Sequence, residues 1–359
     1  MFLTVLFTLV ALAVGFIIVL RLTLNLGKGP VADKTAQDYN KEMDFDNTSD
    51  ETRIKNAGDN TNKYYDLVTD FYMWGWGNSF HFAPRAATES LEESVARHEY
   101  YLSNKLDLKP GMKVLDLGCG IGGPMQNIAR FSGAQITGVN NHPYQIQVGR
   151  KGVEKNNLQD LCEFFKSDFM KVNKPDNSYD AAYAIEATCH AGDRVGCYRE
   201  ILRMLKPGSK FAAYEWCTTD KYDPKNPEHV EAIQNIIKGD GLPCVLSTDE
   251  VVQAMKDAGY ENVESIDLVA PENLAHNPVP WYQPFVGLSI KSLRSLAQSQ
   301  LGAFICHKFL TVMEMSKLLP DGSVKSYEVL IAASKGLRYG GEKHIFTPCF
   351  LVVGTKPQK

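Results

Sequence analysis

The fold is decided by one stretch of the sequence, V-L-D-L-G-C-G-I-G-G at residues 114–123. A short apolar segment runs into a glycine-rich turn, and a carboxylate stands just ahead of the first glycine. Glycines let the backbone turn tightly and approach a ligand closely, because a side chain at these positions would collide with it. The stretch is therefore typical of a loop that binds a nucleotide cofactor. Its candidate contacts are Asp116, Gly118, Cys119, Gly120 and Gly122.

The residues around this loop indicate which cofactor it binds. Its glycines satisfy the dinucleotide pattern G-x-G-x-x-G, a weak signal on its own, and a dinucleotide site needs an acidic residue about 20 positions further on to hold the ribose. The second strand, expected at residues 135–139, is instead followed by Asn140 and Asn141. The acidic group is Asp116, where it would face the amino group of a methionine moiety. The sequence thus favours S-adenosylmethionine over NAD, with another nucleotide or a structural turn as alternatives.

Strands and helices alternate beyond this point. Strands are expected at 113–117, 135–139, 163–167, 179–185, 210–215, 263–269 and 346–354, and helices at 89–106, near 123, 143 and 193, at 248–258 and within 285–334. This alternation predicts an α/β fold with a doubly wound, mostly parallel sheet that binds ligands at the carboxyl ends of its strands. Asn140 and Asp168, which each follow one of these strands, are further candidates for cofactor binding.

Composition narrows the function. The 359 residues carry a formal charge of −4 and show no basic run, which argues against a nucleic-acid partner. The eight cysteines are scattered without a C-x-x-C pair, so neither a metal site nor a disulfide framework is indicated. Reduced thiols that face the cytosol fit this pattern best.

The N-terminus contains an apolar run. Residues 2–20 carry no charge and approach the roughly 20 residues that span a bilayer as a helix. No Lys or Arg precedes the run, whereas Arg21 and Lys28 follow it, so the positive-inside rule leaves the body of the protein on the cytoplasmic side. We expect a transmembrane anchor at 1–21 and, at 22–60, a polar linker or a loosely packed helical arm. A signal or transit peptide and a buried or interfacial helix are the alternatives.

A second informative stretch is Y-M-W-G-W-G-N-S-F-H-F at residues 72–82. Aromatic residues commonly fill cores, and a packed turn is one interpretation. So many rings interleaved with glycine also suit a site that holds an apolar polycyclic substrate or a cationic intermediate. The candidates for substrate binding are Tyr72, Trp74, Trp76, Phe80 and His81.

Acid–base candidates follow the strand expected at 179–185. Glu186 and His190 stand at its carboxyl end, where the donor of a doubly wound sheet binds. A buried carboxylate is rare without a partner, whereas a lone His is often structural. His98 and Glu200, on flanking helices, are further candidates for proton removal, although a solvated helix face would explain both equally well.

The motifs, taken in order, resemble those of sterol 24-C-methyltransferases. The resemblance rests on Y-M-W-G-W-G-N-S-F-H-F, L-D-L-G-C-G-I-G-G-P, I-E-A-T-C-H-A and Y-E-W at 214–216, and it runs from about residue 64 to the C-terminus. Two positions depart from the family pattern. Met73 replaces a common Glu, so no acid role is transferred to that position, and Gly192 stands where a Pro commonly follows.

The resemblance implies a class I methyltransferase-like fold with a C-terminal sterol-methyltransferase segment. It implies methyl transfer from S-adenosylmethionine to carbon 24 of a sterol side chain, through a carbocation, with Glu186, His98, Glu200 and His190 as catalytic candidates. The expected regions are the anchor at 1–21, the linker at 22–60, an aromatic sterol-binding region at 61–106, a donor domain at 107–240 and a C-terminal region at 241–359.

The same resemblance implies a sterol and a membrane as partners, and a homo-oligomer as an assembly. The expected location is the endoplasmic reticulum membrane, with the catalytic domain facing the cytosol. Two alternatives remain open at this point. One is a methyltransferase acting on another membrane lipid, a quinol or a phosphobase, and the other is a sterol-binding protein whose donor loop is vestigial.

Overall fold

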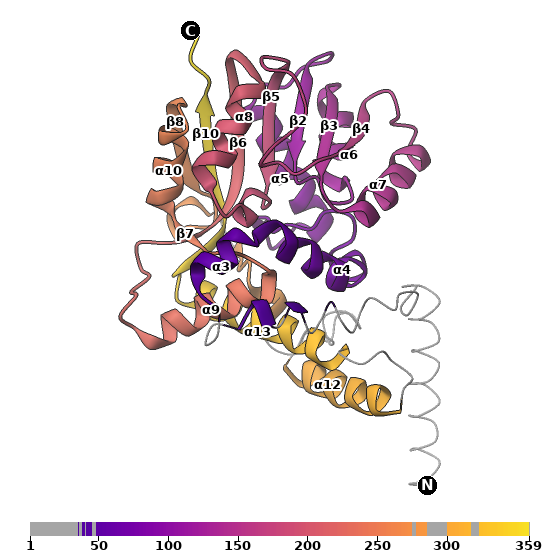
Figure 1. The fold of residues 1–359 in the computed structure, drawn as a ribbon, viewed down its shortest axis with the longest axis vertical. Helices are drawn as coiled ribbons and strands as arrows, with labels where there is room; N and C mark the ends of the chain where they lie inside the picture. Colours follow the sequence, from indigo (N-terminus) through magenta and orange to yellow (C-terminus); the bar gives the residue numbers. More distant parts are fainter. Residues whose placement is uncertain are drawn as a thin grey trace.

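The structure is a computed structural model, and it describes residues 35, 38–39, 41–44, 48–274, 278–285, 300–316 and 323–358. An eight-stranded sheet forms its centre, with strands in the order β4-β3-β2-β5-β6-β10-β8 and the short β7 beside β6 (Figure 1). The strands are β2 Lys113–Leu117, β3 Gln135–Asn140, β4 Cys162–Lys166, β5 Tyr179–Ile185, β6 Leu205–Thr218, β7 Leu246–Ser247, β8 Glu261–Asp267 and β10 Phe346–Thr355. A separate antiparallel pair joins β1 Arg85–Ala86 to β9 Pro278–Val279.

Helices surround the sheet. They are α3 Asp50–Lys55, α4 Ala57–Trp76, α5 Leu91–Lys105, α6 Gly123–Ser132, α7 Pro143–Lys155, α8 Arg194–Met204, α9 Pro227–Asp240, α10 Thr248–Asp257, α12 Gln300–Met315 and α13 Ser323–Glu342. Three short 3₁₀ turns are η1 Thr188–His190, η2 Pro271–Asn273 and η3 Gln283–Phe285.

The direction of the strands creates the binding edge. β2 pairs in parallel with β3 on one side and with β5 on the other, so the chain winds away from β2 in both directions. A doubly wound sheet opens a crevice at the carboxyl ends of its strands at this point. The predicted α/β fold with a mostly parallel sheet is confirmed, and the antiparallel strand is β10, which lies between β6 and β8.

Local signals explain where several helices begin. Ser90 and Glu93 form a capping box at the start of α5, and Ser247 and Glu250 form another at the start of α10. In each box a hydroxyl and a carboxylate satisfy backbone N–H groups that have no partner within the helix. These starts lie within two residues of the expected ones.

Two helices were not expected from the sequence. The aromatic run at 72–76 forms the last turn of α4 rather than a loop, and α4 crosses the boundary that we expected at residue 60. The other is α9, although Asn226 caps it, Pro227 occupies its first turn and Gly241 ends it with a φ of +66°. Those three residues are ordinary helix-boundary signals that could have revealed it.

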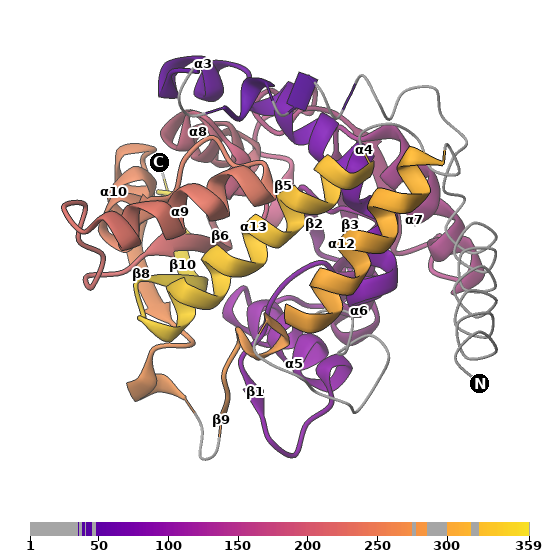
Figure 2. The ribbon, with the colours of Figure 1, turned by 90° about the horizontal axis from the view of Figure 1, so that it is seen from below.

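Helices α4, α9, α12 and α13 form a layer at the carboxyl edge of the sheet. α4 crosses the ends of the strands, and α9 and α13 run side by side beyond it with α12 next to α13 (Figures 1 and 2). Ile233 and Ile236 of α9 and Leu337 of α13 share a buried apolar cluster with Trp216 at the end of β6. This layer therefore closes the crevice from outside the sheet.

The anchor expected at 1–21 lies outside the described residues. Among the helices that the structure describes, none is long and apolar enough to cross a membrane.

Candidate active site

A cavity of about 110 Å³ lies at the carboxyl edge of the sheet, under α4. Its walls come from six separate parts of the chain, which the fold brings together. They are the first half of α4, the residues around Phe80, the turns after β2, β3 and β4, and the segment 185–192 after β5. Nine of the predicted site residues line it, namely Phe80, His81, Gly118, Cys119, Gly120, Asn140, Asp168, Glu186 and His190.

The glycine loop forms one side by its backbone. Gly118 has a φ of +71°, and a Cβ built on it would lie 2.4 Å from the Cβ of Ala187. Any side chain there would be strained and would collide with the turn after β5. The amides of Gly118 and Cys119 donate to the carbonyl of Val139 at 2.8 and 3.1 Å, so the loop is fixed against β3. The cradle fits a ligand that the backbone itself contacts.

Side chains from the next two turns extend this side. Asn140 donates to the carbonyl of Gly120 at 3.0 Å and to Gln145 at 2.9 Å, which orients its amide beside the loop. Asp168 accepts from the amide of Met170 at 2.8 Å. Gly122 is the N-cap residue of α6, with a φ of +77°.

Asp116 lies behind the loop. Its side chain is buried and accepts a hydrogen bond from the Tyr183 hydroxyl at 3.0 Å. Burial raises the pKa of Asp116 to about 7 although this bond lowers it. The structure thus places Asp116 in the strand that leads into the loop and not among the residues that line the cavity.

Glu186 is the most constrained acid–base candidate. Its φ of +51° lies in the left-handed region, which is costly for a residue with a side chain and is often found at functional sites. One carboxylate oxygen accepts from the amide of Phe82 at 2.7 Å and the other from the indole of Trp216 at 2.8 Å. Burial nevertheless raises the pKa of Glu186 to about 8. A positive charge in the cavity would favour its ionised form.

His190 is held as a neutral ring. Its Nδ1 lies 3.3 Å from the carbonyl of Gly241, which can only accept, so Nδ1 carries the proton. Nε2 then accepts from the Tyr65 hydroxyl at 3.3 Å. Burial lowers the pKa of His190 to about 4. This arrangement suits a residue that positions Tyr65 better than one that takes up a proton.

The turn between Glu186 and His190 is held from behind as well. Thr188 donates to Glu215, which also accepts from Tyr198 at 2.6 Å and forms an ion pair with Arg194 at 2.6 Å. All four side chains are buried. Glu215 and Trp216 are adjacent on β6, and neighbouring strand residues point to opposite faces of the sheet. Their bonds to Thr188 and Glu186 therefore hold the turn from both faces.

His98 and Glu200 lie away from the cavity lining. The His98 ring stacks on Tyr214 with centroids 3.7 Å apart, and burial holds its pKa well below the ordinary value. Glu200 accepts from the amide of Val172 and from Arg203, both at 2.8 Å. Although burial opposes it, hydrogen bonding from Arg203 keeps the pKa of Glu200 below its ordinary value. The structure does not bring either residue to Glu186.

On the other side, the rings of Phe80 and Tyr65 line the cavity, whereas Tyr72 and Trp76 are not among the lining residues. The ring of Tyr72 lies 5.7 Å from that of Trp76 and 5.5 Å from that of Phe80, and Phe80 lines the cavity. His81 bonds to Glu99 at 3.1 Å, which holds its pKa above the ordinary value against the effect of burial. Trp74 belongs to α4, but its side chain lies outside the described part of the structure.

Sequence reasoning missed three contributors. Tyr65 and Thr61 contact His190 from α4, and Trp216 holds Glu186 from β6. Tyr65 and Thr61 stand four residues apart, on one face of a helix, which is the signal that would have identified them once α4 was recognised.

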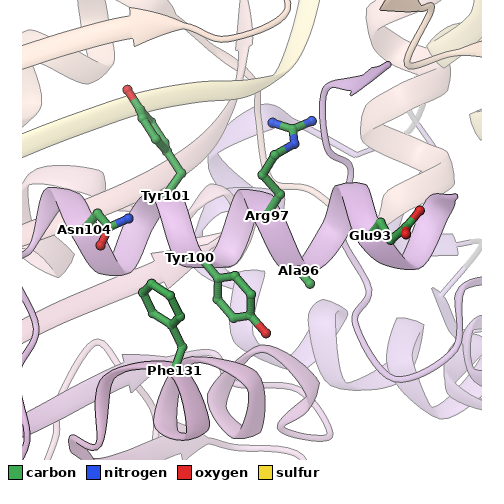
Figure 3. Close-up of a pocket in the computed structure, with 7 residues that line it drawn as sticks. All are labelled: Glu93, Ala96, Arg97, Tyr100, Tyr101, Asn104 and Phe131. Atoms are coloured by element: carbon green, nitrogen blue, oxygen red, sulfur yellow. The ribbon is translucent and has the colours of Figure 1, made fainter. Parts of the chain in front are cut away.

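A second hollow lies between α5 and α6, on the outer surface. Figure 3 shows Tyr100 of α5 stacked on Phe131 of α6, with centroids 4.4 Å apart. None of the residues lining it was predicted to take part in function. Phe131 lies near the end of α6, whereas the glycine loop precedes its start. Among the described residues, no group of His, Cys, Asp and Glu could hold a metal ion.

The fold and the glycine cradle together define a class I methyltransferase-like protein. The family model described as methyltransferase domain matches residues 115–213, and the one described as sterol methyltransferase C-terminal matches residues 293–358. Solved structures with this fold include a putative sarcosine dimethylglycine methyltransferase from Galdieria sulphuraria, with a TM-score of 0.58 and 20% identity over 82% of this chain and 99% of that one. Another is geranyl diphosphate C-methyltransferase from Streptomyces coelicolor, with a TM-score of 0.59 and 15% identity over 85% and 98%.

Curated relatives are much more similar in sequence. Cycloartenol-C-24-methyltransferase of Arabidopsis thaliana is 47% identical over 88% of this chain and 92% of its own. Sterol 24-C-methyltransferase of Saccharomyces cerevisiae is 42% identical over 93% and 88%. The chain belongs to the sterol 24-C-methyltransferase family.

Proposed function

We propose that this protein transfers a methyl group from S-adenosylmethionine to carbon 24 of a sterol side chain. Family membership supports the reaction. The observation that carries it to this site is the position of Glu186, a buried carboxylate that lines one cavity with the glycine loop and with Phe80. An acid–base group, a donor cradle and an aromatic wall are the three parts that such a reaction needs.

The donor side is made by Gly118, Cys119, Gly120, Asn140 and Asp168. When bound there, S-adenosylmethionine supplies an activated methyl group. The backbone amides and carbonyls of the loop are fixed by their bonds to β3, so they are oriented before a ligand arrives. Asp116, one residue inside the strand, stays a candidate for holding the methionine amino group.

In this proposal the aromatic side binds the sterol and stabilises the positive charge that forms on it. Addition of the methyl group to the side-chain double bond leaves a carbocation on the sterol, and π faces stabilise positive charge without forming a bond to it. Tyr72, Trp76 and Phe80 supply these faces, and Trp74 and His81 remain candidates for substrate contact. Loss of a proton then restores a double bond. In this proposal Glu186 accepts that proton. The Phe82 amide and the Trp216 indole support the role, because both stabilise its ionised form.

Incubation of the purified protein with labelled donor and a panel of sterols tests the proposal. Cycloartenol and other sterols with a double bond at carbon 24 should gain one methyl group, measured by mass, whereas a sterol with a saturated side chain should not react. Methylation of a quinol or phosphobase in place of the sterols would favour the alternative enzyme. Donor binding without transfer to any of them would favour a sterol-binding protein.

Glu186→Gln separates binding from chemistry. General-base catalysis contributes about 10² to 10⁴ in rate, so we expect kcat to fall by that factor while the affinity for the neutral sterol changes little. Glu200→Gln is the matched comparison, since its carboxylate is engaged by Arg203. An equal loss of kcat in both variants would show that proton removal does not depend on the group at the cavity.

The cellular setting is part of the same proposal. A membrane anchor at 1–21 would bring the catalytic domain to a substrate dissolved in a bilayer, at the cytosolic face of the endoplasmic reticulum. Fractionation of the full chain and of a variant lacking residues 1–21 tests it, with activity on detergent-solubilised sterol as the readout of folding. We also propose that the chain is divided into the regions 1–21, 22–60, 61–106, 107–240 and 241–359, and that it forms a homo-oligomer.

A further inference from the structure

Asp240 is a buried carboxylate that the reaction described above does not use. It is the last residue of α9, its side chain is 5% exposed, and its Oδ2 atom has no hydrogen-bond partner among the described residues. Its Oδ1 atom lies 3.5 Å from the Tyr72 hydroxyl, which is long for an O–H···O bond. In the part of the chain that the structure describes, no Lys, Arg or His nitrogen forms an ion pair with its carboxylate within 4.0 Å.

A charge in this position is costly by itself. Removing a carboxylate from water without a cation or a full set of donors carries a large penalty, and buried groups left in this condition often have a function. Glu215 shows the contrast within the same protein, because Arg194, Tyr198 and Thr188 all bond to its carboxylate. Asp240 has only the hydroxyls of Tyr72 and Tyr64 beside its carboxylate and no ion-pair partner among the described residues. Its charge is therefore matched by an opposite charge only when a cation comes near it.

Two neighbours of Asp240, Tyr72 and Gly241, connect it to residues of the cavity wall. Tyr72 stands between Asp240 and the cavity, with its hydroxyl toward Asp240 and its ring 5.5 Å from that of Phe80, which lines the cavity. The next residue, Gly241, accepts from His190 at 3.3 Å, so the end of α9 is attached to the cavity wall. The titratable groups within electrostatic reach of Asp240 are Tyr39, Tyr64, Tyr65, Tyr72, Glu186 and Cys189.

We propose that Asp240 is the counter-charge for the cationic side chain of the sterol and acts through Tyr72 rather than by contact. The inference rests on the proposed function and adds a residue to it. A carboxylate that touched the cation could form a bond to it, whereas one screened by a phenol ring stabilises the charge only through space. Asp240 therefore stabilises the cation without touching the substrate, and Tyr72 is the residue that contacts the substrate.

The inference predicts a linked proton. Burial raises the pKa of Asp240 to about 8, so the carboxyl group is mostly protonated at pH 7 before a cation arrives. A cationic ligand favours the carboxylate, and the proton leaves to the buffer. Glu186, whose pKa is also about 8, can release a second proton, so the contribution of Asp240 is the difference between the wild type and Asp240→Asn.

The test compares two sterols that differ in charge. One carries a dimethylsulfonium group with sulfur in place of carbon 25, where the positive charge develops after carbon 24 is methylated, and the other has a saturated neutral side chain. Both are titrated by calorimetry into the full chain with S-adenosylhomocysteine bound, in two buffers of different ionisation enthalpy. Since the sulfonium charge is permanent, any proton released comes from the protein.

We expect the wild type to bind the sulfonium sterol at least about tenfold more tightly than the neutral one. Asp240→Asn should reduce this preference by about tenfold, release up to one proton fewer and leave the neutral sterol within about twofold. Tyr72→Phe, which keeps the ring but loses the hydroxyl, should lose part of the preference. Asp267→Asn is the control, because Asp267 is a partly buried carboxylate that already accepts from Thr347 at 2.7 Å and from the Val269 amide at 3.0 Å. It should behave as the wild type.

An unchanged charge preference and proton count in folded Asp240→Asn would overturn the inference while leaving the proposed function intact. If that variant does not fold, an unchanged preference in Tyr72→Phe overturns it instead. Failure of the neutral sterol to bind the wild type would overturn the proposed function, and the inference with it.

Discussion

The two sides of the cavity are built in different ways. The glycine side is made of backbone, and its shape is fixed by bonds between adjacent strands, such as those from Gly118 and Cys119 to Val139. The aromatic side is made of side chains that come from α4, the segment after it, β6 and the end of α9. In the proposed function the glycine side fits the shape of a ligand, whereas the aromatic side stabilises charge. Glu186 and Asp240 are both buried. We therefore expect the glycine side to be sensitive to an added atom and the aromatic side to be sensitive to an altered charge.

The largest effect is expected from a single methyl group on the glycine side. Gly118→Ala places a Cβ 2.4 Å from that of Ala187 at a φ of +71°, so the loop must move away from the turn that carries Glu186. We expect affinity for S-adenosylhomocysteine to fall by at least about 100-fold, or about 2.7 kcal/mol, in a calorimetric titration. Gly111→Ala is the control, because Gly111 has a similar φ of +84° but nothing within 4 Å of its Cβ. Equal losses in both variants would attribute the effect to backbone strain alone.

A smaller effect is expected from the carboxylate behind the loop. Asp116 keeps its proton up to about pH 7 when folded but only to about pH 4 when unfolded, so the folded state binds more protons between these values. Its contribution to stability therefore falls as the pH rises from about 4 to about 7. Between pH 5 and pH 8 the wild type should lose of the order of 2 kcal/mol more than Asp116→Asn, measured by urea unfolding.

The same variant tests the role predicted from the sequence. If Asp116 reaches the methionine amino group, Asp116→Asn also weakens donor binding. If it serves only Tyr183, the donor affinity stays the same and only the pH dependence of unfolding changes. Identical pH dependence in the two proteins would show that Asp116 is ionised in the folded state throughout this range.

The same division separates what the sequence could predict from what it could not. The strands at 113–117 and 179–185 were predicted to the residue, because apolar runs that end in glycine or a polar turn are local signals. The cradle at Gly118, Gly120 and Asn140 followed from the order of those strands. Trp216 and Asp240 could not be found in this way, since each meets its partner only through the packing of distant elements. Tyr65 could have been found only by first recognising α4, whose spacing places it on one face with Thr61.

The helical layer explains two further differences. The aromatic run at 72–82 gave no helical signal, because its glycines interrupt the pattern, yet α4 continues to Trp76 and presents Tyr72 toward Asp240. Glu200 shows the opposite case. Its position on the helix after His190 made it a candidate, but α8 turns it toward Arg203, where an ion pair accounts for it.

The smallest effect tests whether the aromatic side responds to charge rather than to packing. The ring centroids of Phe82 and Phe346 lie 5.8 and 5.5 Å from that of Trp216. Trp216→Phe keeps an aromatic ring between them but removes the indole N–H that donates a hydrogen bond to Glu186. That bond lowers the pKa of Glu186, so its loss raises the pKa further and reduces the ionised fraction at pH 7. We expect kcat to fall by about tenfold at pH 7, equivalent to about 1.4 kcal/mol, with the rising limb of its pH profile moved to higher pH.

Trp281→Phe is the matched control for this substitution. Its ring lies 5.3 Å from that of Phe82 in the same cluster, but no hydrogen bond joins it to Glu186 among the described residues. It removes the same atoms from the same cluster, so a loss due to packing should appear in both variants, with a pH profile that does not move. A shifted profile in Trp216→Phe alone would show that the aromatic side tunes a charge. Equal losses without a shift would mean that both sides of the cavity depend on shape, and the comparison between them would fail.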